Sequence, residues 1–202
     1  MRTQALVAAL VALPLSSCSA LEGAVGFLRE PTPDVARATQ TAGGSVRVSM
    51  PGNWRVSHDT GGNEVVKIHT MTIESSGSAL ATVQAFTPAI DLDAVQFLKD
   101  VADGMQRAVA DMTKGMAAAD VGPMTRERRA FLGAEREALR TIVTLHVLGE
   151  RVPTAVTLYT ARTPTTTVTL TTTIAVEDEA RVVPGFELIA RSLAVDGVPS
   201  RP

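Results

Sequence analysis

The residue with the clearest chemistry is Cys18, the single cysteine of the 202-residue chain. A lone cysteine cannot form a disulfide within the chain, so its thiol is available for another use. It ends the run Leu15-Ser16-Ser17-Cys18, which follows Arg2 and an apolar stretch over residues 5–15. A basic start, a short apolar stretch and small residues before a cut are the layout of a secretory signal peptide. About 11 apolar residues are too few to cross ~30 Å of hydrocarbon as a helix.

The same four residues resemble a bacterial lipobox. The resemblance implies that the Cys18 thiol receives a diacylglycerol, that a signal peptide over residues 1–17 is removed, and that the new amino terminus is acylated. Several acyl chains anchor a protein to a bilayer, since each buried methylene contributes ~0.8 kcal/mol. Ser19 is similar to the default for outer-membrane sorting in a two-membrane envelope, whereas in a single-membrane organism the anchor would lie in the outer face of the plasma membrane. An unlipidated secreted protein is the alternative.

Arg126, Arg128 and Arg129 form the one basic cluster of the sequence. Guanidinium groups bind carboxylates and phosphates through paired hydrogen bonds. The cluster is therefore the candidate site for an acidic partner protein, a carboxylate or an anionic lipid head group. Glu127 lies within it, and a solvated strand face is the favoured alternative, because exposed ion pairs are common and weak.

The three histidines, His58, His69 and His146, lack the spacing of a metal site, since the sequence contains no HxxxH, HxH or CxxC pattern. His58 is expected beside Asp59 in a loop. The other two fall on expected strands, where they could meet across the sheet, but structural histidines are the favoured interpretation. We therefore expect no metal ion.

Catalytic patterns are equally sparse. No GxSxG elbow occurs, the serines of residues 75–78 belong to an expected turn, and no glycine-rich phosphate loop has the required spacing. Glu135 and Glu137 share a strand face but are expected to be solvated beside Arg136 rather than paired for glycoside hydrolysis. The sequence favours a protein that is not an enzyme and has no cofactor. A hydrolase stays a remote alternative that would need His69 or His146 to meet a carboxylate and a serine.

Composition fits one ordinary folded domain. The chain has 19 basic and 21 acidic residues, a net charge of −2 and 45% hydrophobic residues. This balance excludes a basic nucleic-acid binder, a disulfide scaffold and a disordered acidic tail. We expect a lipidated amino terminus and flexible tether over residues 18–44, because Pro31, Pro33 and the pair Gly43-Gly44 interrupt any periodicity. A single domain is expected over 45–195 and a tail over 196–202.

Within that domain, apolar spacing predicts a long helix over 93–116, with Asp93 as its N-cap and Gln96 at the capping-box position. A second helix is expected from Pro184 to Ser192. The row of threonines from Thr165 to Thr173 indicates a strand with one half-exposed face. The expected strands cover residues 45–50, 65–73, 79–86, 121–132, 139–148, 154–162 and 165–176. Short turns between them predict antiparallel pairing and an α+β fold, with a sheet of about six strands packed between helices.

This order resembles the PsbP-like superfamily, which includes the extrinsic photosystem II protein, a Ran-binding nuclear import factor and many bacterial lipoproteins. The matching motifs are Met50-Pro51-Gly52-Asn53-Trp54, Leu132-Gly133-Ala134-Glu135 and the segment Phe186–Leu193. The resemblance implies an α/β/α sandwich whose members mostly bind or assemble with other molecules, and it supplies no catalytic motif.

Together these features predict a non-enzymatic, lipid-anchored protein of the cell envelope. It would bind or stabilise a membrane-associated or periplasmic complex. The alternative is a small-ligand or lipid-binding module with a pocket between sheet and helix, motivated by the apolar face of the long helix and by the arginine cluster.

Overall fold

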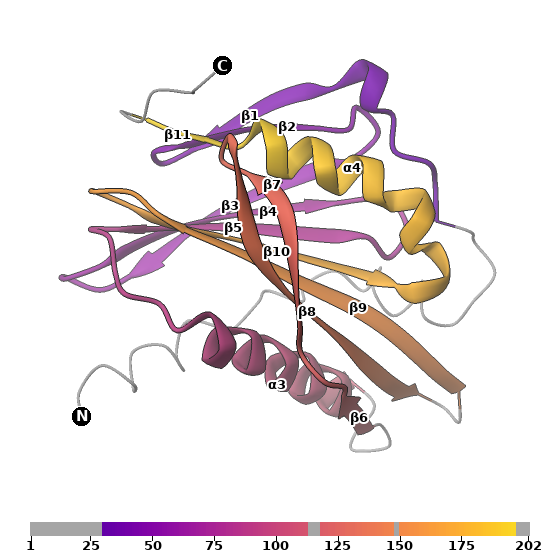
Figure 1. Cartoon of the computed structure of the whole chain (residues 1–202). Helices are drawn as coiled ribbons and strands as arrows, with labels where there is room; N and C mark the ends of the chain where they lie inside the picture. Colours follow the sequence, from indigo (N-terminus) through magenta and orange to yellow (C-terminus); the bar gives the residue numbers. More distant parts are fainter. Residues whose placement is uncertain (1–29, 113–117, 148–149, 197–202) are drawn as a thin grey trace.

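The computed structural model describes residues 30–112, 118–147 and 150–196, which form two antiparallel sheets and two α-helices (Figure 1). In the larger sheet, every pair of neighbouring strands is antiparallel. Its order is β3 (Arg55–Gly62), β4 (Lys67–Glu74), β5 (Leu80–Thr87), β10 (Thr167–Ala175), β9 (Glu150–Arg162), β8 (Ala134–Val147) and β6 (Ala118–Val121), with β7 (Thr125–Phe131) also beside β8. The α+β class is as expected, and the sheet of eight strands is larger than the six predicted.

The smaller sheet has the order β1 (Thr39–Gly43), β2 (Val46–Met50) and β11 (Ala194–Val195). Gly44 makes the turn between the first two strands with a φ of 59°, which glycine adopts without steric cost. Two short 3-10 turns, η1 (Val35–Arg37) and η2 (Val176–Asp178), complete the described elements.

Helices α3 (Ala94–Met112) and α4 (Glu179–Ser192) cover opposite faces of the larger sheet (Figure 1). Strand β9 shows why two cores form, because successive side chains of a strand point to opposite faces. Val156 and Leu158 join the core beneath α3, whereas Ala155 and Tyr159 join the core beneath α4. The predicted sandwich of a sheet between helices is therefore confirmed.

The start of α3 is as predicted. The Oδ1 of Asp93 accepts hydrogen bonds from the backbone N–H groups of Val95 and Gln96, both at 3.0 Å. The Gln96 side chain donates to Asp100 Oδ1 at 2.9 Å, one turn further along, rather than closing a capping box. Leu98 and Val101 on the apolar face are buried. The predicted extension to residue 116 lies outside the described residues.

Two predictions are wrong: one strand was missed, and one helix begins earlier than predicted. Residues 55–62 form strand β3, although the polar and glycine-rich sequence predicts a loop. This strand lies at an edge of the sheet and is almost entirely exposed, so it lacks the hydrophobic alternation that identifies a strand. Helix α4 begins at Glu179, so Pro184 lies within the helix rather than at its first position.

The threonines of β10 are buried rather than half-exposed. Thr167, Thr169 and Thr171 are 3%, 0% and 5% exposed. This strand lies between β5 and β9 in the middle of the sheet, where both faces are covered. The Thr167 hydroxyl donates to Ile90 O at 2.6 Å and accepts from Ile90 N at 3.0 Å, which satisfies it.

The tether predicted up to residue 44 is too long, because the fold already includes residues 30–43. Glu30 is 2% exposed, and its Oε2 accepts hydrogen bonds from the N–H groups of Ser78 at 2.5 Å and Ala79 at 3.2 Å. Its backbone carbonyl accepts from Arg181 Nη1 of α4 at 2.9 Å. Strand β1 then pairs with β2 along its whole length. At the other end, Asp196 N donates to Ser45 O at 2.8 Å, so the first residue of the predicted tail is held by the domain.

We predict that Glu30→Ala lowers the free energy of unfolding by about 1–3 kcal/mol, since it leaves the Ser78 N–H without its acceptor. Denaturant unfolding of the variant would measure this. The matched control is Glu64→Ala, because Glu64 is exposed. Equal stability of the two variants would contradict a structural role for the Glu30 carboxylate.

Candidate functional site

The three arginines of the basic cluster lie on β7, at an edge of the larger sheet. Pairing with β8 places Arg126 opposite Leu139, which belongs to the core beneath α3. Arg129 shares its face with Phe131, which belongs to the core beneath α4. The cluster is therefore divided, with Arg126 and Arg128 on the α3 side and Arg129 on the α4 side.

On the α3 side, Arg126 Nη1 donates to Glu137 Oε1 at 2.8 Å, and both side chains are more than half exposed. Arg128 is exposed and lies opposite Glu137 in the strand register. Among the described residues no carboxylate forms an ion pair with Arg128. Of the three guanidinium groups, this one is the most available to a carboxylate from outside.

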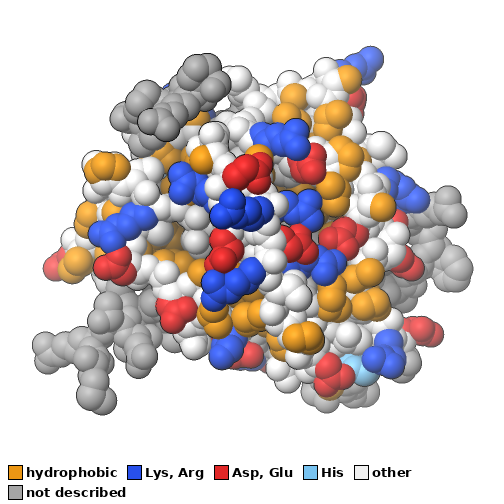
Figure 2. Space-filling view, viewed as in Figure 1, with side chains coloured by type: hydrophobic (Ala, Val, Ile, Leu, Met, Phe, Trp, Pro, Cys, Tyr) orange, Lys and Arg blue, Asp and Glu red, His pale blue; other side chains and the backbone are white. Residues whose placement is uncertain are grey.

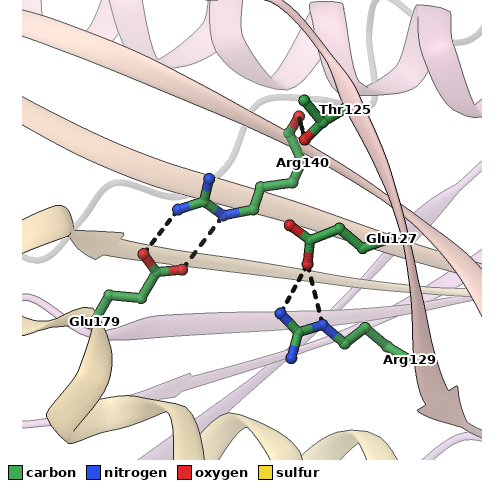
Figure 3. Close-up of polar contacts among 5 residues, drawn as sticks. All are labelled: Thr125, Glu127, Arg129, Arg140 and Glu179. Carbon is green, nitrogen blue, oxygen red and sulfur yellow. Dashed lines mark hydrogen bonds and ion pairs between the residues drawn. The ribbon is translucent and has the colours of Figure 1, made fainter.

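On the α4 side, two ion pairs lie next to each other (Figure 3). Arg129 donates to Glu127 Oε2 from Nη2 at 2.7 Å and from Nε at 3.1 Å. Arg140 of β8 binds both carboxylate oxygens of Glu179, at 2.7 and 3.3 Å. The Arg140–Glu179 pair attaches the first residue of α4 to the sheet and is only about a quarter exposed, so we assign it a structural role.

Acidic and basic side chains alternate across the middle of this face of the molecule (Figure 2). The face that contains β7, β8 and α4 therefore has little net charge of its own. Its pairs are mostly exposed, and exposed ion pairs contribute only about 0–1 kcal/mol each. An incoming charged group can replace one partner of such a pair at small cost.

Tyr159 lies beneath this charged face. It is 8% exposed, and its ring centroid is 5.5 Å from that of Phe131. Burial raises the pKa of Tyr159, and the positive charge of Arg129 acts in the opposite direction, while Glu127 adds to the increase. The hydrogen bond to Glu127 raises the pKa of Arg129 in turn.

A cleft of about 350 Å³ lies on the opposite, α3 side. Leu139 and Leu158 give it apolar walls, Thr160 gives it a hydroxyl, and Ala94 closes it at the first residue of α3. Glu135 and Glu137, which the sequence predicts to be solvated, are exposed and also line the cleft, and Glu137 is the partner of Arg126. The expected pocket between sheet and helix thus has a counterpart here, with an apolar wall and a charged rim.

The histidines are arranged differently from the predictions. His58 lies on strand β3 rather than in a loop, and its Nδ1 is 3.4 Å from Nε2 of His69 on β4. His69 therefore meets His58, and not His146, whose Nε2 is 2.8 Å from Asp120 Oδ2 on β6. Burial lowers the pKa of His69, the neighbouring His58 lowers it further, and Asp59 opposes both effects.

Sequence reasoning missed this histidine pair because it treated residues 55–64 as a loop. The placement of Val56, His58 and Thr60 at alternate positions was the available signal for a strand. In the described ranges, no group of three or more histidine, cysteine, aspartate or glutamate side chains converges as a metal site would require. Cys18, the predicted lipidation site, lies outside the described residues.

No helix within residues 30–112, 118–147 and 150–196 is both long and apolar enough to cross a membrane.

No protein-family model matches the sequence, and no curated protein matches it either. Solved structures that are similar to this chain include cyanobacterial PsbP (CyanoP) from Synechocystis sp. PCC 6803. That match has 17% identity and a TM-score of 0.43, and it covers 91% of this chain and 99% of that one.

Two further similar structures are more distant. LpqN, which is involved in cell envelope biogenesis of Mycobacterium tuberculosis, is 9% identical with a TM-score of 0.37, and the match covers 82% of this chain and 98% of LpqN. The Ran-binding protein Mog1p of Saccharomyces cerevisiae is 10% identical with a TM-score of 0.34, over 78% of this chain and 96% of Mog1p.

The charged face yields a prediction about alkaline pH. Tyr159 is the single tyrosine of the chain, so phenolate absorbance reports it alone. We expect its titration midpoint above the ordinary value of 10.0, because burial disfavours the phenolate. Since the unfolded tyrosine ionises first, this contribution to stability is complete below pH 10 and is lost as the pH rises through the raised pKa.

Arg129→Met should move the midpoint higher still, because the guanidinium favours the phenolate. Arg151→Met is the matched control, since Arg151 is exposed at the far end of β9. A midpoint at or below the ordinary value in the native protein would contradict this account of the site.

Proposed function

We propose that the protein is a non-enzymatic, lipid-anchored protein of the cell envelope that binds a protein partner at the membrane surface through the edge of β7. The observation that carries the proposal is an exposed edge strand bearing Arg126, Arg128 and Arg129. The sequence supports the anchor through the lipobox-like run that ends at Cys18.

The edge of β7 suits the addition of a strand. On one side β7 pairs with β8, and in the described part of the chain no strand pairs with its other side. Such an edge presents backbone N–H and C=O groups that an extended segment of another protein can bind. Among the described residues the Arg128 guanidinium has no ion-pair partner, and the exposed pair of Arg126 and the partly exposed pair of Arg129 can exchange partners. The proposed partner segment is therefore extended and acidic.

The tether limits where this partner can be. Glu30 is fixed to the domain, so only residues 19–29 separate it from Cys18. About 12 peptide steps span roughly 40 Å at most. A lipid on Cys18 would thus keep the domain close to the bilayer, and we expect the partner to be membrane-bound or membrane-associated.

The anchor is tested by fractionation of cells that produce Cys18→Ala. We expect the native chain in the membrane fraction with a mass that shows cleavage before Cys18 and acylation, and the variant without acyl chains and released from membranes. Ser16→Ala is the control that keeps the thiol. A variant that stays membrane-bound like the native chain would contradict lipid anchoring.

Partner binding at the edge of β7 is tested by crosslinking and affinity purification of the tagged, lipidated protein from its own membranes. One stoichiometric partner is expected with the native chain, and its yield should fall at least about tenfold in Arg128→Glu, since like charges meet across the interface. Arg151→Glu, the same change at an exposed arginine on β9, should leave the yield unchanged. Equal yields from all three proteins would overturn the role of β7.

The cleft beside α3 supports a second candidate function, the binding of a small ligand or lipid. Its apolar wall of Leu139 and Leu158 and its charged rim would suit an amphipathic molecule. Native mass spectrometry distinguishes the two functions, because a co-purified small molecule without a protein partner favours the cleft. A partner-bound protein with no additional small mass favours the edge of β7.

A further inference from the structure

We propose that a chain of hydrogen bonds through His58 and His69 is an acid-sensitive contact, which holds strand β1 against the larger sheet and releases it when both rings are protonated. Thr41 Oγ1 of β1 lies 3.2 Å from His58 Nε2. His58 Nδ1 lies 3.4 Å from His69 Nε2, and His69 Nδ1 lies 3.3 Å from Thr60 Oγ1. The chain therefore runs without a break from β1 to β3 and β4, and it is separate from the arginine edge.

The number of protons on the two rings decides whether this chain can form. When both rings are neutral, each has one N–H, and the three hydrogen bonds run in one direction from one hydroxyl to the other. With one added proton, both outer nitrogens donate to the threonine hydroxyls, and the remaining proton lies between the rings. With two added protons every ring nitrogen is a donor, so His58 Nδ1 and His69 Nε2 direct two N–H groups at each other. The bond between the rings is then lost, and two positive charges face each other.

The backbone of β1 lies directly against the bond between the rings. A Cβ at Gly43 would lie 2.0 Å from His69 Nε2 and 3.0 Å from His58 Nδ1, and a Cβ at Gly44 would lie 3.1 Å from the Cβ of His69. Two rings that repel each other must therefore displace β1 or turn out into solvent. Either movement breaks the hydrogen bond between Thr41 and His58, which connects β1 to the larger sheet.

The charged groups around the two rings do not compensate a second positive charge. The carboxylate beside the pair is that of Asp59 on β3, and Lys67 lies on the same face of β4 as His69. Neither β1 nor β5 carries a charged side chain, and Arg55 and Glu74 lie opposite each other at the far end of β3 and β4. One negative charge is thus set against one positive charge, and nothing remains to balance the second proton.

The second proton is therefore bound at a lower pH than an isolated histidine would bind it. Burial lowers the pKa of His69 below the ordinary value of 6.5, the charge of His58 lowers it further, and Asp59 opposes both effects. In the unfolded chain His69 takes up its proton near the ordinary value, before the folded chain does. This contribution to stability is therefore complete above pH 6.5 and is lost as the pH falls from there to the lowered pKa of His69.

The test is an acid titration of the full chain in detergent micelles, followed by nuclear magnetic resonance. At about pH 7.5 we expect a nuclear Overhauser contact between an α-proton of Gly43 and the ring protons of His69, because the two groups touch. The contact should be lost by roughly pH 4.5, with the midpoint of the lower of the two titration steps of His58 and His69. A contact that persists when both rings are charged would overturn the proposal, as would a loss with a midpoint unrelated to the rings.

His58→Asn tests the second charge directly, because its amide reaches the position of Nδ1 and cannot be protonated. The amide oxygen can accept from the charged ring of His69, so we expect the contact with Gly43 to persist at roughly pH 4.5. His146→Gln is the matched control and should lose the contact as the native chain does, because His146 lies with Asp120 on other strands. Loss of the contact in His58→Asn at the native midpoint would overturn the role of the second charge.

Discussion

Burial of the central strands on both faces is the constraint on which the rest of the structure depends. The central parts of strands β9 and β10 lie between two cores, so each residue there must suit one covered face or the other. Leu158 packs beneath α3 and Tyr159 beneath α4, while Thr169 is fully buried. A centre that accepts few charges leaves ionisable groups to the strands at the edges. The arginines of β7 and His58 of β3, both on edge strands, are consistent with this arrangement.

The two edges of the sheet are chemically different. Strand β3 carries His58 at one edge, and β7 carries Arg126, Arg128 and Arg129 at the other. Exposed edges are open to unwanted strand pairing, and charged side chains are a common protection against it. The same charges give an edge its selectivity, because they admit a segment of opposite sign and repel others. The arginines of β7 can serve both purposes, which explains why they lie on an edge strand rather than on a helix.

The sequence predicted those parts of the fold in which burial produces a periodic pattern of apolar residues along the chain. The face of α3 that contains Leu98 and Val101, the Asp93 cap and the antiparallel order of the later strands follow from local spacing and capping chemistry. Strand β3 was missed because its exposed residues show no hydrophobic alternation, and residues 30–43 were missed because their order depends on distant partners. Glu30 is held by Ser78 and Arg181, contacts that no local pattern reveals. The division of the arginines across β7 follows from alternation, but only once the strand and its register are known.

The same distant contacts connect Glu30, the first described residue, to the arginine edge. The carbonyl of Glu30 binds Arg181, in the first turn of α4, and Glu179 of that turn binds Arg140 of β8. Arg140 lies opposite Thr125, the first residue of β7, and its carbonyl accepts from the Thr125 hydroxyl at 3.3 Å. A continuous series of contacts therefore runs from the point where the tether leaves the domain to the start of the arginine-bearing strand. In the proposed function, a lipid on Cys18 and an acidic partner segment at β7 would therefore act on parts of the domain that these contacts connect.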